Sequence, residues 1–353
     1  MIPRGYTGED SPHRDLSIEK MADRFLILLT GLLFLAAPAF CLGDDDVWMT
    51  LTWENDFIAD DDSGYTNGIG FSWGHGPMDS LSTDRMPDWL YAVGQALPYS
   101  QDEAFTHAVS YRVSQLMYTP DDIREEELIE DDRPYAGVLL WSTHLHSYRE
   151  NFSNRYWLSL GAVGPISGAE QVQEIIHGLI DVNTAEGWDN QLDNEFTFLL
   201  ANERLYRLRN GTFSNGREWD LVSMTELMAG TLRSEVGAGI GLRFGRNLLQ
   251  SFPAASLVPG RNINPLSASL ASEWHLFVNL YGRYVFNDIT LDGTYFRDSH
   301  SVELNNEQAF ISLGGAWHGQ DWGFIASIQE STRTFEERSE DTLFASFSLT
   351  YRY

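Results

Sequence analysis

The final segment of the chain constrains its fold more than any other. From Phe344 to Tyr353 the side chains alternate without a break, with Ala345, Phe347, Leu349, Tyr351 and Tyr353 on one side and Phe344, Ser346, Ser348, Thr350 and Arg352 on the other. This two-residue period predicts a β-strand whose apolar face points outward. An apolar-out strand that ends on an aromatic residue is typical of bacterial outer-membrane barrels, whose lipid faces are flanked by aromatic girdles. Because a sheet in lipid has to close on itself to satisfy its backbone hydrogen bonds, we predict an all-β, transmembrane antiparallel β-barrel.

The front of the chain predicts export. Arg24 is followed by an apolar run, Phe25–Phe40, and then by a candidate cleavage site. This arrangement is typical of a secretory signal peptide. We therefore expect residues 1–43 to be an N-terminal extension with a signal peptide, and residues 44–353 to form the barrel. A lipoprotein interpretation of Cys41 is weaker, because a bulky phenylalanine precedes it where a small residue is required.

The amino-acid composition narrows the classes of function that the chain can have. The chain has 51 acidic against 23 basic residues and a formal net charge of -28 at pH 7, and its only lysine and cysteine, Lys20 and Cys41, fall in the predicted leader. Such an acidic chain is a poor partner for nucleic acid. Next to anionic lipopolysaccharide it favours a divalent cation between the two surfaces. The alternative is that the acidic residues only keep the loops solvated.

The two-residue period recurs through the chain and predicts twelve strands, an even number like that of single-chain bacterial barrels. They are expected near 47–55, 65–74, 105–116, 135–148, 155–163, 194–206, 219–230, 234–244, 272–286, 308–317, 322–329 and 343–353. No stretch after the leader has the roughly 18 continuous apolar residues that a membrane helix needs, so spanning is expected by strands alone. A soluble, secreted all-β domain is the alternative, because it shows the same alternation.

The segment 272–286 illustrates the two faces expected of each strand. Lipid should meet Trp274, Leu276, Val278, Leu280, Tyr284 and Phe286. The lumen should receive His275, Asn279, Tyr281 and Arg283.

Three connections are predicted to lie outside the cell if both chain ends are periplasmic: 56–64, 117–134 and 164–193. The third contains a predicted helix, Ala169–Ile180. Its apolar stripe consists of Val172, Ile175, Ile176, Leu179 and Ile180, with Gln173, Glu174 and His177 toward the other side.

The first of these connections and the strand ends beside it are rich in oxygen ligands. They hold Glu54, Asn55, Asp56, Asp60, Asp61 and Asp62, followed by Tyr65, Thr66, Asn67 and Gly68. Carboxylate and carbonyl oxygens suit Ca²⁺. Counting by twos along the two strands predicts that the side chains of Asp56 and Thr66 both point inward at the rim. The alternative is a solvated acidic turn.

His177 is the candidate general base, because it lies on the short helix over the rim and precedes a group of acidic and amide side chains. A neutral imidazole near pH 7 can take a proton from water, as ester hydrolysis requires. The alternative is a histidine that only orients the loop. A second candidate, Ser72 in Gly-Phe-Ser-Trp-Gly, fits the pattern of a nucleophile elbow, but it lies within an alternating strand rather than at a strand-to-helix turn.

At these residues the chain resembles the lipid A 3'-O-deacylase family of outer-membrane barrels, the LpxR-like proteins. The resemblance runs through Glu54-Asn55-Asp56, Tyr65-Thr66-Asn67-Gly68, Tyr118-Thr119-Pro120, Asp132-Arg133-Pro134-Tyr135-Ala136-Gly137, 161–181 and 187–195. It covers most of the first half of the barrel, and the second half is similar only as barrel strands.

The resemblance implies a twelve-stranded barrel in the outer membrane with a Ca²⁺-dependent esterase site at its outer rim. Such a site removes the 3'-linked acyloxyacyl group of lipid A. The catalytic residues of the family fall on Asn55, Asp56, Thr66 and His177, and Asn55 and Asp56 would hold the calcium ion.

The chain departs from the family pattern at two positions. Asn183 stands where the characterised enzymes have an acidic residue, and a lysine of the second outer loop has no counterpart. Arg124 and Arg133 are the candidates for the role of that lysine in binding substrate. A phospholipase that acts on lipids of the same leaflet and a non-catalytic porin or scaffold are the alternative functions.

Overall fold

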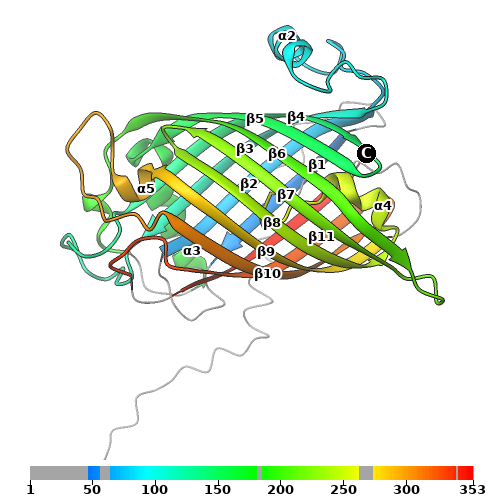
Figure 1. The fold of residues 1–353 in the computed structure, drawn as a ribbon. Helices are drawn as coiled ribbons and strands as arrows, with labels where there is room; N and C mark the ends of the chain where they lie inside the picture. Colours follow the sequence, from blue (N-terminus) through cyan, green and yellow to red (C-terminus); the bar gives the residue numbers. More distant parts are fainter. Residues whose placement is uncertain (1–46, 56–63, 181–184, 262–272, 339–340, 353) are drawn as a thin grey trace, which may run out of the picture.

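Twelve antiparallel strands form a closed barrel in the computed structural model (Figure 1). The structure describes residues 47–55, 64–180, 185–261, 273–338 and 341–352, so the predicted signal peptide lies outside the described residues. The strands are β1 (Val47–Asn55), β2 (Gly64–Met78), β3 (Thr106–Thr119), β4 (Ala136–Arg149), β5 (Phe152–Val163), β6 (Glu195–Thr212), β7 (Glu218–Gly230), β8 (Arg233–Arg246), β9 (Glu273–Asp288), β10 (Glu307–His318), β11 (Trp322–Ser331) and β12 (Thr342–Arg352). Each strand pairs with its neighbours in sequence, and β12 closes the barrel on β1. The predicted fold class and all twelve strands are confirmed.

The closing pair of strands shows how the alternation is used. Small polar side chains meet across the lumen side, with Thr50 Oγ1 2.8 Å from Thr350 Oγ1 and Thr52 Oγ1 3.0 Å from Ser348 Oγ. On the opposite face Phe347 stacks on Trp53, with ring centroids 5.8 Å apart. The apolar face of the last strand therefore points outward, as predicted.

The outer surface of the barrel is apolar. On β9 the predicted outward residues Leu276, Leu280 and Phe286 are exposed, while the predicted lumen residues Asn279 and Tyr281 are buried. A side chain that is exposed and apolar on a closed barrel faces lipid, because water would oppose such a surface. No helix within the described residues is long and apolar enough to cross a membrane.

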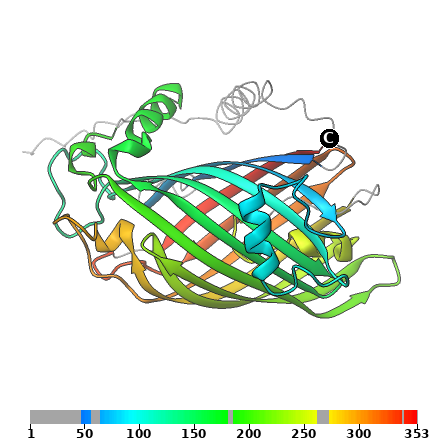
Figure 2. The same ribbon diagram turned by 90° about the horizontal axis from the view of Figure 1, so that it is seen from above.

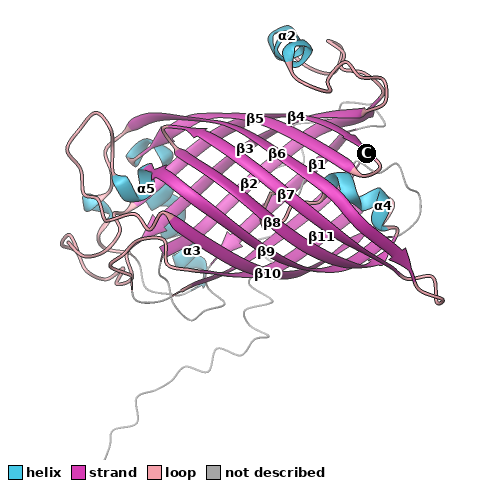
Figure 3. Cartoon of the chain, in the orientation of Figure 1, coloured by secondary structure: helices cyan, strands magenta, loops and turns pink. Residues whose placement is uncertain are grey.

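The helices gather at the two ends of the barrel (Figure 3). One end carries the long connections 120–135, 164–194 and 289–306, which contain η2 (Pro165–Ser167), α3 (Ala169–Ile180), η3 (Trp188–Asn190) and α5 (Ile289–Asp292). The other end has the short turns 150–151, 213–217 and 319–321, with α2 (Asp88–Ala96), α4 (Leu248–Ser251) and η4 (Phe252–Ala254) in its two longer connections. Outer-membrane barrels have short periplasmic turns and longer extracellular loops, so α3 lies at the extracellular rim.

The segment after β8 folds into the lumen as a plug, defined here as residues 248–261. Leu257 and Val258 of the plug are buried in a cluster with lumen side chains of four strands, among them Met224 and Tyr281. Gly260 has a positive φ of 71°, and a Cβ atom there would lie 1.8 Å from Glu54 Oε1, so only glycine fits. The plug extends from the periplasmic end into the lumen, where its last residues reach Glu54 and Glu226.

Hydrogen bonds and ion pairs hold the plug to the wall. Arg112 Nη1 donates to the Gly260 carbonyl at 2.8 Å, and Arg155 Nη1 donates to the Arg261 carbonyl at 2.7 Å. Ser256 Oγ donates to Glu203 Oε2 at 3.0 Å, while the Arg261 guanidinium pairs with a buried glutamate of β7. These contacts join residues far apart in the sequence, so the plug and the barrel are expected to fold together.

Candidate active site at the outer rim

Helix α3 packs against the outer wall of the barrel, not over its opening. The loop that leads into it is fixed by Gln115 Nε2, which donates to the Ser167 carbonyl at 2.6 Å. Gln115 alternates with the lumen residues of β3 and shares the outer face with Val113, which is 41% exposed. Figure 2 shows α3, in green, outside the ribbon of the barrel. The helix therefore lies against the surface that meets the outer leaflet of the membrane.

Gly137 of β4 allows this close approach. A Cβ atom at this position would lie 2.1 Å from Ser167 Oγ and 2.5 Å from Ala169 Cβ, both much shorter than ordinary contacts. Ala169 is buried with Met117 of β3 and Trp188 in one apolar cluster. The start of α3 is thus seated directly on β3 and β4.

The wall-side face of α3 is polar along most of its length. Ala169, Gln173 and His177, which are four residues apart and so share one face, are all buried. The expected apolar stripe is divided: Ile175 is 63% exposed, whereas Val172 is partly buried and packs on the cluster that contains Ala169 and Trp188. A helix on a soluble protein would bury its apolar stripe, but on a membrane barrel the exposed face meets lipid.

Trp188 and Tyr135 lock α3 in place. Trp188 Nε1 donates to Gln173 Oε1 at 2.6 Å. Its ring packs on the Tyr135 ring with centroids 5.0 Å apart. The Tyr135 carbonyl accepts from the Leu192 backbone N–H at 2.9 Å, which ties the following segment to the same support. Two of the sequence motifs, Asp132–Gly137 and 187–195, are thereby explained as the support for the helix.

Asn55 and Asn67 lie at the same rim as α3. Asn55 ends β1 directly opposite Asn67 of β2, and Asn67 is opposite Met117 of β3. Neighbouring strands are about 4.8 Å apart, so Asn55 lies about 10 Å from Met117 across the sheet. His177 is two helical turns from Ala169, or about 12 Å along α3. The structure thus places Asn55 and His177 at the same end and on the outer side of the barrel.

The other two predicted catalytic residues are described in part or not at all. Asp56 lies outside the described residues, as does the side chain of Thr66. The backbone of Thr66 lies in β2 at a register shift between Tyr65 and Asn67. Because a bulge changes which residues share a face, counting by twos cannot fix the direction of Thr66.

Asn67 and Gln173 are two polar residues that the sequence argument did not select. Both are buried, and within the described part of the chain Asn67 Oδ1 and Gln173 Nε2 have no hydrogen-bond partner. An unpaired buried polar atom costs about 1–3 kcal/mol, so it suggests a ligand or water at the site. Their positions in the sequence could have indicated both residues, since Asn67 follows the candidate Thr66 and Gln173 precedes the candidate His177 by one helical turn.

Oxygen ligands dominate the polar groups of this rim. Among the described residues, no three His, Cys, Asp or Glu side chains are grouped to hold a metal ion. Asn55 and Asn67 offer amide oxygens, and Asp56 to Asp62 carry the nearby carboxylates in the sequence. Amide and carboxylate oxygens fit Ca²⁺ and not the softer metals that prefer sulfur or imidazole.

The two arginines considered for substrate binding lie in different surroundings. Arg124 is exposed and pairs with Asp122, with Nε 3.1 Å from Oδ1. Arg133 is buried, donates to Thr290 Oγ1 at 3.1 Å and lies 4.5 Å from the centroid of the Tyr118 ring. Burial lowers the pKa of Arg133 to about 10. Only Arg124 is open to a molecule that approaches from outside.

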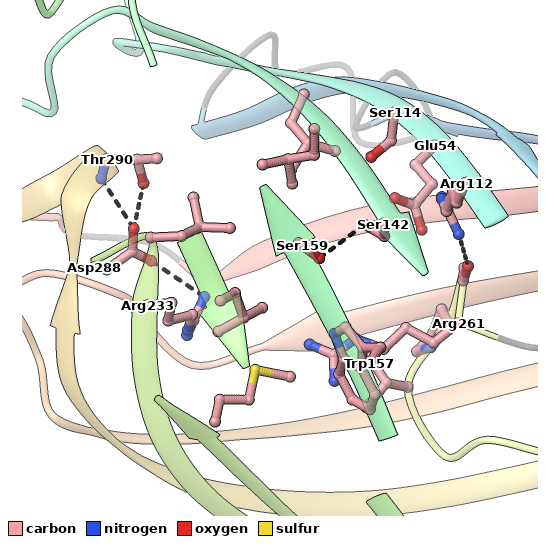
Figure 4. Close-up of a pocket in the computed structure, with 18 of the residues that line it drawn as sticks. Glu54, Arg112, Ser114, Ser142, Trp157, Ser159, Arg233, Arg261, Asp288 and Thr290 are labelled. Atoms are coloured by element: carbon pink, nitrogen blue, oxygen red, sulfur yellow. Dashed lines mark hydrogen bonds and ion pairs between the residues drawn. The ribbon is translucent and has the colours of Figure 1, made fainter. Parts of the chain in front are cut away.

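Arg133 lines a chamber of about 320 Å³ inside the barrel, which the plug borders on one side. Figure 4 shows Arg233 paired with Asp288 at one side of this chamber and Arg112 bonded to the plug at the other. Ser72 also lines the chamber, from the middle of β2. Ser72 therefore lies on a regular strand, which agrees with the rejection of a nucleophile elbow.

Comparison with known proteins identifies the family. The family described as "Outer membrane protein LpxR" matches residues 26–353. The chain belongs to the LpxR family. Among solved structures, LpxR from Salmonella typhimurium matches with a TM-score of 0.72 at 16% identity, covering 87% of this chain and 100% of that chain. This likeness shows that the two proteins share a fold.

Other solved barrels are less similar. The β domain of the Bordetella autotransporter BrkA gives a TM-score of 0.40 at 12% identity, covering 88% of this chain and 99% of that chain. A search of curated proteins found no match. Membership of the LpxR family and the closed barrel place the protein in the bacterial outer membrane, as predicted.

Proposed function

We propose that this LpxR-family protein is a lipid A 3'-O-deacylase that hydrolyses the 3'-linked acyloxyacyl ester of lipid A. The observation that carries the proposal is His177, buried on the wall-side face of α3 at the rim that also holds Asn55. His177 lies outside the barrel wall, on the side where the outer leaflet lies. A lipid ester can therefore enter from the membrane without passing through the lumen.

His177 acts as the general base in this proposal. It takes a proton from a water molecule that attacks the ester carbonyl, so no covalent intermediate forms on the protein. Such catalysis contributes on the order of 100-fold to 10,000-fold. Gln173 lies one turn away, and its hydrogen bond to Trp188 fixes the position of the helix that carries the base.

Asn55 and Asp56 would hold a calcium ion at the rim. Asn67 is directly across from Asn55, and its Oδ1 atom, which has no hydrogen-bond partner among the described residues, offers a further oxygen ligand. A bound calcium ion supplies positive charge that polarises an ester carbonyl. Thr66 would position the water or the ion. Because each of these ligands is an oxygen, the set fits calcium chemistry.

The exposed face of α3 suits a substrate with acyl chains. Ile175 of α3 and Ile166 of η2, just before it, are exposed apolar residues that face the outer leaflet. An acyl chain that packs along them would bring its ester toward the space between helix and wall. Exposed Arg124, in the neighbouring loop, would pair with a lipid A phosphate, since a guanidinium binds phosphate with two parallel hydrogen bonds.

The lumen plug argues against the porin alternative. The plug and the ion pairs that hold it obstruct the path through the barrel. A phospholipase remains the nearest alternative enzyme, because the same groups could hydrolyse a glycerophospholipid ester.

The deciding experiment is mass spectrometry of lipid A and phospholipids from cells that express the parent, His177→Ala or Glu174→Gln. The parent and Glu174→Gln, a control on the exposed face of the same helix, should release the 3'-linked chain. His177→Ala should lose at least 100-fold of this activity while still folding as a barrel. Intact lipid A with shortened phospholipids would establish a phospholipase instead, and unchanged pools of both lipids would refute the proposal.

A further inference from the structure

Helix α2 packs on the outer wall of the barrel at the end opposite to α3. Its Leu90 is buried with Val109 of β3 and Leu145 of β4. These two strand residues alternate with Ser110 and His144, which line the internal chamber, so they belong to the outer face. A Cβ atom at Gly94, one turn after Leu90, would lie 2.8 Å from Leu81 Cδ1, which shows how closely the segment packs.

The direction of α2 is that of a helix lying in the membrane plane. It runs across the long axis of the barrel and not along it (Figure 2). It belongs to the connection between β2 and β3, at the periplasmic end. A helix in this position, outside the wall and across the barrel axis, lies level with the periplasmic leaflet.

One flank of α2, next to the wall-side residues Leu90 and Gly94, is exposed and apolar. Trp89 is 46% exposed and Val93, one turn later, is 48% exposed. The Trp89 ring lies 6.4 Å from that of Trp141 on the outer face of β4, and Trp141 stacks on Tyr111 at 6.5 Å. This flank of α2 thus continues the aromatic, lipid-facing surface of the wall. Tryptophan and tyrosine are enriched where a membrane meets water.

The charge of the segment selects among phospholipids. Residues 79–105 contain one basic residue, Arg85, against the acidic residues Asp79, Asp84, Asp88, Asp102 and Glu103. These carboxylates repel an anionic headgroup and attract an ammonium group. The charge favours a zwitterionic phospholipid over an anionic one.

We propose that α2 is an interfacial helix that docks on the periplasmic leaflet and binds a zwitterionic aminophospholipid. The acyl chain packs on Trp89 and Val93, and the headgroup ammonium lies among the carboxylates at the start of the helix, Asp84 and Asp88. This surface is separate from the site under α3, so its function does not depend on the deacylase proposal.

The test uses a single cysteine. In a Cys41→Ser background, which has no other cysteine, Val93→Cys is labelled with a fluorophore and the barrel is reconstituted in vesicles. Ser214→Cys, in the exposed turn at the same end, is the matched control for a position in water. Retained folding is checked by the heat-dependent mobility of the barrel in gels.

Lipids with a quencher on the acyl chain then report the contact. Quenching at position 93 should exceed that at position 214 at least threefold, and phosphatidylethanolamine should quench more than phosphatidylglycerol. Asp84→Asn with Asp88→Asn should remove this headgroup preference. Equal quenching at the two positions would overturn the docking, and equal quenching by the two lipids in the parent would overturn the headgroup assignment.

Discussion

Replacing Gly137 with alanine perturbs the seating of α3 without touching a proposed catalytic group. The added Cβ would lie 2.5 Å from Ala169 Cβ and 2.1 Å from Ser167 Oγ. Carbon atoms in favourable contact are about 3.5 Å or more apart, so Ala169 has to retreat by about 1 Å. Because Ala169 begins α3 and is buried against the wall, the retreat moves the helix and His177 with it.

The expected cost to activity is large and the cost to folding is small. A misplacement of about 1 Å at a reacting group costs on the order of 100-fold in rate. Overpacking of this kind lowers the free energy of unfolding by about 1–3 kcal/mol, which a closed barrel of twelve strands should tolerate. Gly137→Ala should therefore give a folded barrel with about 1% of the parental kcat/KM.

The assay is release of the 3'-linked chain from lipid A by purified protein, measured as kcat/KM. Gly282→Ala on β9 is the matched control, because a Cβ there meets only the Gln308 carbonyl, at 4.0 Å. It should retain parental activity. A folded Gly137→Ala variant within threefold of the parent would refute the argument that contact between β4 and α3 positions the base.

Three further predictions test the metal, the core and the plug. Chelation of divalent cations should abolish deacylation and added Ca²⁺ should restore it; activity that survives chelation would dismiss the calcium role. Asp220→Asn should lower the free energy of unfolding in urea by about 3–5 kcal/mol, because it leaves two buried guanidinium groups without their carboxylate. In the parent, Asp220 Oδ2 accepts from Arg207 Nε at 2.8 Å and from Arg243 Nη2 at 2.6 Å. The parent should not conduct ions in planar bilayers, whereas replacement of plug residues 255–261 by a short glycine–serine linker should open the lumen; equal conductance of the two would contradict the role of the plug.

The strands were predictable because their pattern is local. A lipid face and a polar lumen impose the same two-residue alternation on every strand, and a single segment such as β9 contains enough residues to show it. The first predicted strand agrees with β1 at both ends, Val47 and Asn55. The candidate site residues Asn55 and His177 were likewise selected from short motifs, and the structure places them at a strand end and in the last turn of a helix, both at this rim.

The plug and α2 were not predicted, because each is defined by distant partners. The plug is fixed by pairs such as Arg112 and Gly260, which are 148 residues apart. No local period marks a segment that fills a lumen. Helix α2 exposes Trp89 and Val93 next to its buried Leu90, so its apolar surface is wider than the stripe that marks an ordinary surface helix.

The orientation of α3 shows why periodicity predicted the helix and not its buried face. The stripe that contains Ile175 would face the protein core if the solvent were water, because burial of apolar surface would then drive packing. At the outer wall of a barrel, lipid solvates the exposed residue Ile175 at no such cost, and the face with Gln173 and His177 can be turned inward. Buried polar groups need partners, which is why Trp188 donates to Gln173 and why the unpaired atom of Asn67 is informative. In α3 the buried position is occupied by His177, while the apolar Ile175 is exposed. A histidine on the buried side of a membrane-facing helix is therefore stronger evidence for a site than the same histidine on a soluble helix.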